Sequence, residues 1–321
     1  MKAFLKAMLA FATGLGMLGP VVAQEWPTKS VTITVPFAPG GSTDTTARIL
    51  AEKLRNELGQ HVIVDNRGGA GGNIAAGIVA KAAPDGYTML LATNAIVTSP
   101  TLYKSLSYDL KKDLVPVVQI VNFPNVLVVN KDFPAQNLSE FVEYAKAAKG
   151  PLNYGSAGNG SSQHLSTALL NNMINGQMVH VPFKGGALAN AALLGGQIEL
   201  VIAPLVEVLP HIKAGTLKAL GITAKTRSPL LSDVPAIDEV LPGYEVVLWN
   251  GLLAPANTPP AIIDRLNQAV RKVLREPDMQ AKMASQGYRT FDYAPSELKQ
   301  FYAQEQEKWG HMVKISGATL N

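Results

Sequence analysis

A short strand that runs into a glycine-rich turn and then into a helix recurs along this chain, and this unit restricts the possible folds most. In its first copy, positions 31, 33, 35 and 37 are apolar and alternate with Thr and Pro, which predicts a strand. The turn of residues 39–44 follows, and apolar residues at helical spacing predict a helix that ends at Gly59. Such alternation is typical of an α/β fold with a parallel sheet covered on both faces.

Similar units fill the rest of the chain. Up to residue 93 we expect strands at 61–65 and 87–93 and a helix at 73–83. A second run has expected helices at 139–148, 162–174, 187–195 and 206–214 and strands at 152–154, 178–183, 198–203 and 217–223. Three helices, at 259–275, 277–286 and 295–316, are expected to follow and to pack on the first domain.

Two extended apolar stretches separate these runs. Residues 115–130 form a long apolar stretch rich in β-branched side chains, which residues 122–125 interrupt. Residues 245–253 are again apolar and extended. We interpret both as crossings, so that residues 24–122 with 251–321 form domain 1 and residues 123–250 form domain 2. A chain of 321 residues is long enough for two such domains. Ligand sites in these folds lie beyond the carboxyl ends of the strands.

The first 23 residues have the layout of a secretory signal peptide. Lys2 and Lys6 precede an apolar run over residues 7–18, and small residues lead to Gln24. The run is too short to cross a bilayer core of about 30 Å as a helix. We therefore expect cleavage after Ala23 and export, without cysteine, to a compartment such as a bacterial periplasm.

Charge and residue usage exclude several classes of partner. The balance of 28 Lys and Arg against 24 Asp and Glu gives +4, but the basic residues are scattered, so we expect no nucleic-acid partner. The lack of cysteine excludes thiolate metal sites and cysteine nucleophiles. The five histidines never fall at helical metal-pair spacing, and no EF-hand loop occurs. We expect no metal and no cofactor.

Three glycine-rich turns, at residues 39–44, 68–73 and 155–162, lie where a strand gives way to a helix. Glycine lets the backbone approach a ligand, and a helix N-terminus offers free N–H groups to an anion. The alternative is structural, because glycine makes tight turns and Ser, Thr and Asp cap helices. Asp44 in particular suits a loop brace, since its carboxylate would repel an anion. One such turn in each domain, facing across a cleft, would form a clamp.

Enzyme motifs give weaker matches. Gln163 stands where a dinucleotide fingerprint needs its third glycine, and neither a Walker loop nor a Gly-x-Ser-x-Gly elbow occurs. A small periplasmic serine hydrolase using Ser156 or Ser161 with His164 remains an alternative, but the sequence shows no acid to orient the histidine. We therefore expect a binding protein without catalytic residues.

Seven motifs follow one another through nearly all of the chain after residue 23. They are residues 35–44 (VPFAPGGSTD), 66–73 (NRGGAGGN), 84–88 (PDGYT), 154–158 (YGSAG), 181–186 (VPFKGG), 194–197 (LGGQ) and 253–256 (LAPA). Together they resemble the Bug family, the periplasmic solute-binding receptors of tripartite tricarboxylate transporters. The resemblance implies a two-domain periplasmic binding protein of type II, a Venus flytrap whose two crossing segments form the hinge. It also implies a small carboxylate-bearing ligand, delivery to the membrane components of such a transporter, and a monomer.

The resemblance implies that backbone N–H groups and ordered waters hold the ligand carboxylate, at residues 37–44 and 156–161. The candidate ligand-binding residues are Phe37, Ala38, Gly41, Ser42, Thr43, Asp44, Asn94, Ser156, Ala157, Gly158, Ser161, His164, Phe183, Lys184, Ala203 and Trp249.

One departure from the family's pattern concerns charge. Many relatives place an aspartate at the strand end that follows the Gly-Gly-Gln segment, whereas this chain has Ala203 and Pro204 there. Our hypothesis is that the pocket lacks a counter-ion for an amine and prefers a carboxylate with an apolar or aromatic body, against Trp249 and Phe183. A sensor kinase in place of the transporter remains an alternative partner.

Overall fold

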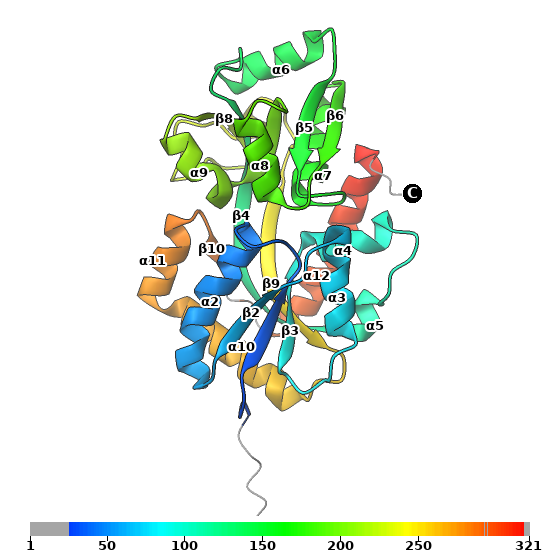
Figure 1. The fold of residues 1–321 in the computed structure, drawn as a ribbon, viewed down its shortest axis with the longest axis vertical. Helices are drawn as coiled ribbons and strands as arrows, with labels where there is room; N and C mark the ends of the chain where they lie inside the picture. Colours follow the sequence, from blue (N-terminus) through cyan, green and yellow to red (C-terminus); the bar gives the residue numbers. More distant parts are fainter. Residues whose placement is uncertain (1–25, 292, 294, 318–321) are drawn as a thin grey trace, which may run out of the picture.

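Two lobes, each a sheet packed with helices, lie one above the other in the computed structural model, which describes residues 26–317 except 292 and 294 (Figure 1). The expected signal peptide, residues 1–23, lies outside the described residues. The first lobe contains residues 26–124 and 247–291, and the second contains residues 125–246. A core of buried apolar residues continues from one lobe into the other along the strands that join them.

The sheet of the first lobe has the strand order β2-β1-β3-β9-β4, with β10 also paired to β4. Its strands are β1 (Val31–Val35), β2 (Val62–Asn66), β3 (Thr88–Thr93), β4 (Leu114–Asn130), β9 (Val247–Pro255) and β10 (Arg289–Thr290). Strands β1, β2 and β3 are parallel, but β9 runs antiparallel to β3 and to β4. The sheet is therefore mixed rather than parallel throughout.

The sheet of the second lobe has the order β8-β4-β7-β5-β6. Its further strands are β5 (Leu152–Ser156), β6 (Met178–Pro182), β7 (Leu200–Pro204) and β8 (Leu217–Ile222). Strands β5, β6 and β7 are parallel, and β4 runs antiparallel to both of its neighbours.

Strand β4 belongs to both sheets and corrects one expectation. It is continuous through residues 122–125, where the sequence predicts an interruption. Pro124 still pairs with Val247 of β9, and Asn125 already pairs with Pro204 of β7. The change of partner thus falls inside the predicted crossing without ending the strand. The domain limits at residues 123 and 250 stay predictions.

Helices surround both sheets. In the first lobe they are α2 (Ser42–Leu58), η1 (Ala70–Gly72), α3 (Asn73–Ala80), α4 (Asn94–Leu102), α5 (Leu110–Asp113), α10 (Pro260–Arg275) and α11 (Pro277–Ser285). In the second lobe they are α6 (Leu138–Ala147), α7 (Ser162–Met173), α8 (Gly186–Leu194), α9 (Leu205–Lys213) and η2 (Ile237–Glu239). Helix α4 has no counterpart among the helices expected from sequence.

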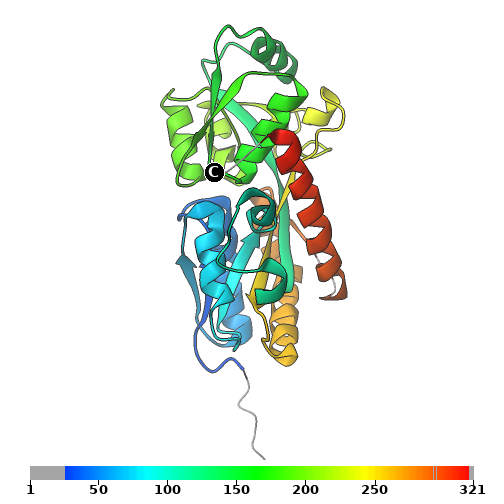
Figure 2. The same ribbon diagram turned by 90° about the vertical axis from the view of Figure 1, so that its right-hand side faces the viewer.

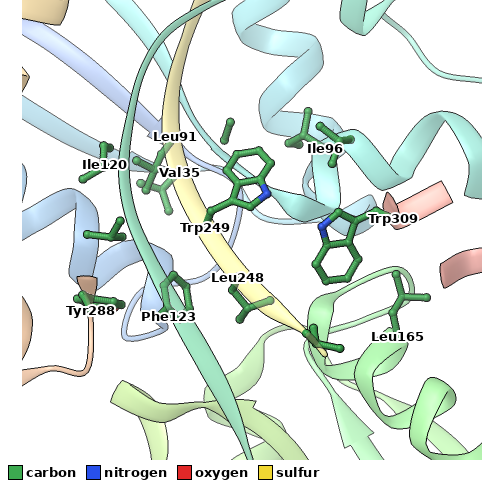
Figure 3. Packing of buried hydrophobic residues seen from close by; sticks show 14 of the residues in the cluster. Val35, Leu91, Ile96, Ile120, Phe123, Leu165, Leu248, Trp249, Tyr288 and Trp309 are labelled. Atoms are coloured by element: carbon green, nitrogen blue, oxygen red, sulfur yellow. The ribbon is translucent and has the colours of Figure 1, made fainter. Parts of the chain in front are cut away.

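The last helix, α12 (Pro295–Ser316), packs on α4 of the first lobe and on α7 of the second. It runs upright along both lobes (Figure 2), which corrects the expectation that it packs on the first domain alone. Its Trp309 lies near Trp249 of β9 in the core (Figure 3). Both indole N–H groups donate to Glu305 Oε2 at 2.7 Å, so one carboxylate ties α12 to a crossing strand.

Candidate functional site

A cavity of about 280 Å³ lies between the lobes. The first lobe contributes residues from the turns after β1 and β3, and the second contributes residues from the turns after β5, β6 and β7. Phe123 of β4 and Leu248 and Asn250 of β9 contribute the remaining wall, from the strands that join the lobes. All five turns leave the carboxyl end of a strand, where ligand sites of such folds are expected.

Four helices begin at the wall of this cavity. Ser42 of α2 and Asn94 of α4 come from the first lobe, and Ser162 of α7 and Gly186 of α8 come from the second. The first N–H groups of a helix have no acceptor within it, and its dipole is positive at this end. Lys184 adds a cationic side chain. The cavity therefore favours an anion.

Two buried side chains on the wall carry polar atoms without a protein partner. They are Nδ2 of Asn94, a donor, and Oε1 of Gln163, an acceptor. Asn94 is 4% exposed and Gln163 is 2% exposed. A buried polar atom left unpaired costs free energy. These two atoms thus point to a ligand that supplies an acceptor to Asn94 and a donor to Gln163.

The side chain of Glu207, on α9 of the second lobe, forms a hydrogen bond with the first lobe. Its Oε1 accepts a hydrogen bond from the Ser42 N–H at 2.9 Å, and its Oε2 accepts from Asn190 Nδ2 at 3.2 Å. Helix α2 has no side-chain cap of its own at Gly41, so Glu207 caps it from the opposite lobe. The pKa of Glu207 is raised, because burial outweighs the hydrogen bonds from Ser42 and Asn190, which act to lower it.

The acidic group that the sequence lacks at the strand end is therefore present in the pocket as Glu207, whereas the preference for a carboxylate over an amine stays a prediction. The carboxylate stands in the first turn of α9, three residues after Pro204, rather than at the strand end. The sequence feature that indicates Glu207 is an acidic residue in the first turn of a helix that follows a buried strand.

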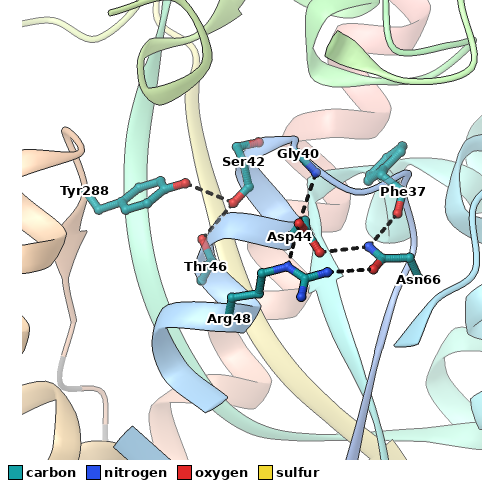
Figure 4. Close-up of polar contacts among 8 residues, drawn as sticks. All are labelled: Phe37, Gly40, Ser42, Asp44, Thr46, Arg48, Asn66 and Tyr288. Atoms are coloured by element: carbon teal, nitrogen blue, oxygen red, sulfur yellow. Dashed lines mark hydrogen bonds and ion pairs between the residues drawn. The ribbon is translucent and has the colours of Figure 1, made fainter. Parts of the chain in front are cut away.

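Asp44 points away from the cavity and braces the first turn. It accepts hydrogen bonds from Gly40 N–H at 3.0 Å, Arg48 Nε at 2.9 Å and Asn66 Nδ2 at 3.1 Å (Figure 4). Asn66 also donates to the Phe37 carbonyl at 3.0 Å. Burial alone would raise the pKa of Asp44, but these hydrogen bonds outweigh it and the pKa is lowered. The structure thus has the loop brace that was the alternative from sequence.

His164 and Ser156 brace the second turn in a similar way. The rings of His164 and His180 are stacked, with centroids 3.8 Å apart and planes 5° apart. His164 Nδ1 accepts from the Gly160 N–H at 3.1 Å, and Ser156 Oγ lies 2.6 Å from His180 Nε2. Burial lowers the pKa of His164 to about 4, and burial with the neighbouring His164 lowers that of His180 to about 3. Both rings are therefore neutral at neutral pH.

This arrangement does not favour the hydrolase. Ser156 has no exposed surface and is paired with His180 rather than His164. Among the described residues, the hydrogen bonds of these two histidines do not include one to a carboxylate. A serine nucleophile needs both an accessible hydroxyl and an oriented base.

The structure places the sixteen predicted site residues in two groups. Nine line the cavity: Phe37, Ala38, Gly41, Ser42, Thr43, Asn94, Ala157, Ser161 and Lys184. Seven lie outside its lining: Asp44, Ser156, Gly158, His164, Phe183, Ala203 and Trp249.

Two of the seven had been expected to contact the ligand through an aromatic ring. Trp249 does not reach the cavity because its indole is buried against Phe301 and Tyr302 of α12. Phe183 instead packs with the apolar cluster around α8 and α9. Sequence reasoning missed Gln163 and Glu207, which no recognised motif singled out.

Metal and membrane features can be stated for the described part of the chain. Residues 26–317, without 292 and 294, contain no group of three or more His, Asp or Glu side chains able to hold a metal ion. Within the same residues, no helix combines the length and apolar character needed to cross a bilayer.

Two α/β lobes joined by crossing strands, with an anion-favouring cavity between them, define a bilobal solute-binding protein. Residues 46–318 match the tripartite tricarboxylate transporter family receptors. The chain belongs to this family of receptors, which are not enzymes, and the resemblance expected from its motifs is confirmed.

Solved structures of similar proteins agree with the fold. Rpa4515 of R. palustris, solved with adipate, is 36% identical with a TM-score of 0.89, covering 92% of this chain and 100% of that one. The periplasmic binding protein BugD is 35% identical with a TM-score of 0.87, covering 92% and 99%. MatC of Rhodopseudomonas palustris, with bound malate, is 36% identical with a TM-score of 0.84, covering 90% and 100%.

Proposed function

We propose that this protein is a periplasmic receptor that captures a small carboxylate-bearing metabolite between its lobes. It then delivers the metabolite to the membrane components of a tripartite tricarboxylate transporter, after residues 1–23 have been removed. The observation that carries the proposal is the buried, unpaired Asn94 Nδ2 at a cavity where four helices begin. An amide donor among helix N-termini suits a carboxylate, since hydrogen bonds to a charged acceptor are the stronger ones.

Ligand binding is coupled to closure in this proposal. Strands β4 and β9 carry the chain between lobes, and the sheet partners of β4 change there, which makes this segment the hinge. Contacts between the lobes depend on closure: a Cβ on Gly160 of the second lobe would collide with Leu102 of the first. A ligand that contacts both lobes shifts the population toward the closed form by its additional contacts there.

Thermal unfolding of the chain from Gln24 onward, unfolded and refolded to remove any guest, tests the proposal against organic acids, sugars and amines. A ligand at about 100 times its Kd adds roughly 2.7 kcal/mol of stability, which raises the midpoint by a few degrees. We expect such a shift with carboxylic acids and no consumption of the compound.

Asn94→Leu removes the donor and keeps the approximate size of the side chain. The loss of a hydrogen bond to a charged group should weaken binding of the active acid by about 10-fold to 100-fold. The matched control is Asn172→Leu, on the exposed face of α7, which should bind as the wild type does. Equal affinities in all three proteins, or shifts with sugars alone, would contradict the proposal.

A further inference from the structure

We infer that Glu207 is a built-in carboxylate that occupies the anion position at the start of α2, so that the receptor selects monocarboxylates over dicarboxylates. The inference deepens the proposed function and rests on it. Rpa4515 and MatC, by comparison, were solved with adipate and malate, which each carry two carboxyl groups.

The first step concerns what fills the N-terminus of α2. This helix is one of two on the first-lobe side of the cavity, and its N–H groups could hold a ligand carboxylate. The Ser42 N–H, however, already donates to Glu207 Oε1 at 2.9 Å. The helix has no cap of its own, so Glu207 takes the role that a ligand carboxylate would otherwise have.

The second step concerns whether Glu207 could instead receive an amine of the ligand. Its Oε1 is taken by Ser42, and its Oε2 accepts from Asn190 Nδ2 at 3.2 Å and Gln163 Nε2 at 3.5 Å. A Cβ on Gly186 would collide with Oε2, and one on Gly41 would lie 3.4 Å from Oε1. The carboxylate thus already accepts three hydrogen bonds from the protein, which leaves less of its acceptor capacity for an ammonium group.

The third step is the charge left for a ligand. Of the residues that line the cavity, Lys184 and Glu207 are the charged ones, so their formal charges cancel. The remaining anion-binding groups are Asn94 Nδ2 and the starts of α4, α7 and α8, of which α4 and α7 already have one N–H capped by Thr93 and Ser161. They suit one ligand carboxylate. A second carboxylate would be held near Glu207 in a small, partly buried space, where repulsion between like charges is strong.

Part of the wall is apolar. Phe37, Phe123, Leu188 and Leu248 line the cavity and provide surface for a hydrocarbon body rather than for a second charged end. Burying an ionised carboxylate against apolar side chains without a partner is strongly unfavourable.

Calorimetric titration with matched pairs of acids tests the inference at pH 7.5. The pairs are butyrate and succinate, hexanoate and adipate, and benzoate and terephthalate, each differing by one carboxylate. The proteins are wild type, Glu207→Ala, Glu207→Gln and the control Glu143→Ala, whose side chain is exposed on α6. We expect the wild type and the control to bind the monocarboxylate of at least one pair 10-fold or more tighter than its partner.

Glu207→Ala empties the anion position and should move the affinity ratio of that pair by at least 10-fold toward the dicarboxylate. Glu207→Gln keeps the acceptor for Ser42 but removes the charge, so its ratio should lie between those of wild type and Glu207→Ala. It also provides the test should the alanine variant fold poorly. The inference would be overturned if the wild type bound each dicarboxylate as tightly as its monocarboxylate partner, or if neither substitution changed the affinity ratios. The proposed receptor function would stand in either case. Failure of all six acids to bind any folded form would instead overturn the proposed function, and this inference with it.

Discussion

His164 is buried and His180 is half-buried, and their rings form a stacked pair next to the turn of residues 156–161. Each contributes one nitrogen to the turn, through Gly160 and Ser156. Their stacked, desolvated rings disfavour protonation, and the pKa of each is lowered, to about 4 for His164 and about 3 for His180. Their protonation therefore opposes the folded state.

The sign of the resulting pH dependence follows from the lowered pKa values. Below the ordinary histidine pKa of about 6.5, the unfolded chain takes up protons that the folded chain does not, so stability falls as the pH falls. Full stability is present above about pH 6.5. We expect the two groups together to remove roughly 4 kcal/mol of unfolding free energy between pH 8 and pH 5.

Urea unfolding at a series of pH values measures this effect. The double variant His164→Asn and His180→Gln retains hydrogen-bond acceptors for the turn, but its two side chains cannot be protonated in this pH range. Its free energy of unfolding should therefore depend much less on pH than that of the wild type. His61→Asn, at an exposed position, should leave the slope unchanged. An equally steep decline in the double variant would show that the histidine pair is not its source.

Individual site residues could be predicted from sequence only where a local motif fixes them. Ser42 lies in such a motif at the start of a helix and lines the cavity, whereas Asn94 was expected only from the resemblance to the family. The contact of Glu207 with Ser42 could not be predicted, because the two residues are 165 positions apart and lie in different lobes. Trp249 shows the reverse case: its position on a crossing strand suggested a cleft wall, but α12 covers its ring.

At the scale of elements, periodic segments were predictable and segments held by their surroundings were not. The expected strands and most helices lie within a few residues of those observed. Helix α4 contains Val97, Thr98 and Pro100, which have low helix propensity, and packing against α12 helps to hold it. In β4, Pro124 and Asn125 resemble a turn, but both remain paired with neighbouring strands.

The attachment of α12 through Glu305 gives a prediction at this scale. Glu305→Ala leaves two buried indole N–H groups, those of Trp249 and Trp309, without an acceptor. We expect a loss of about 2–4 kcal/mol in the free energy of unfolding, since each unsatisfied buried donor costs about 1–3 kcal/mol. Denaturant titration measures it.

Glu305→Gln is the matched variant, because its amide oxygen can still accept from the indoles. Its loss should be about 1 kcal/mol or less. Equal stability of Glu305→Ala and wild type would show that these hydrogen bonds do not hold the helix in place.

For the whole molecule, the order of strands and helices predicts two α/β lobes and two crossings. The periodicity of each segment is local, and the rules of chain connection then leave few arrangements. The chemistry of the cavity depends instead on which side chains from opposite lobes meet. The pairing of Glu207 with Ser42 arises only when both lobes are in place.

A crystal structure of the protein loaded with the acid that most stabilises it tests the central claim most directly. The account predicts density for one acid molecule between the lobes, with a carboxylate oxygen within hydrogen-bond distance of Asn94 Nδ2. Its hydrocarbon part should contact the apolar wall at Phe123 and Leu248. Density for the acid outside this cavity, or within it but with its carboxylate turned away from Asn94 and the helix N-termini, would contradict the account.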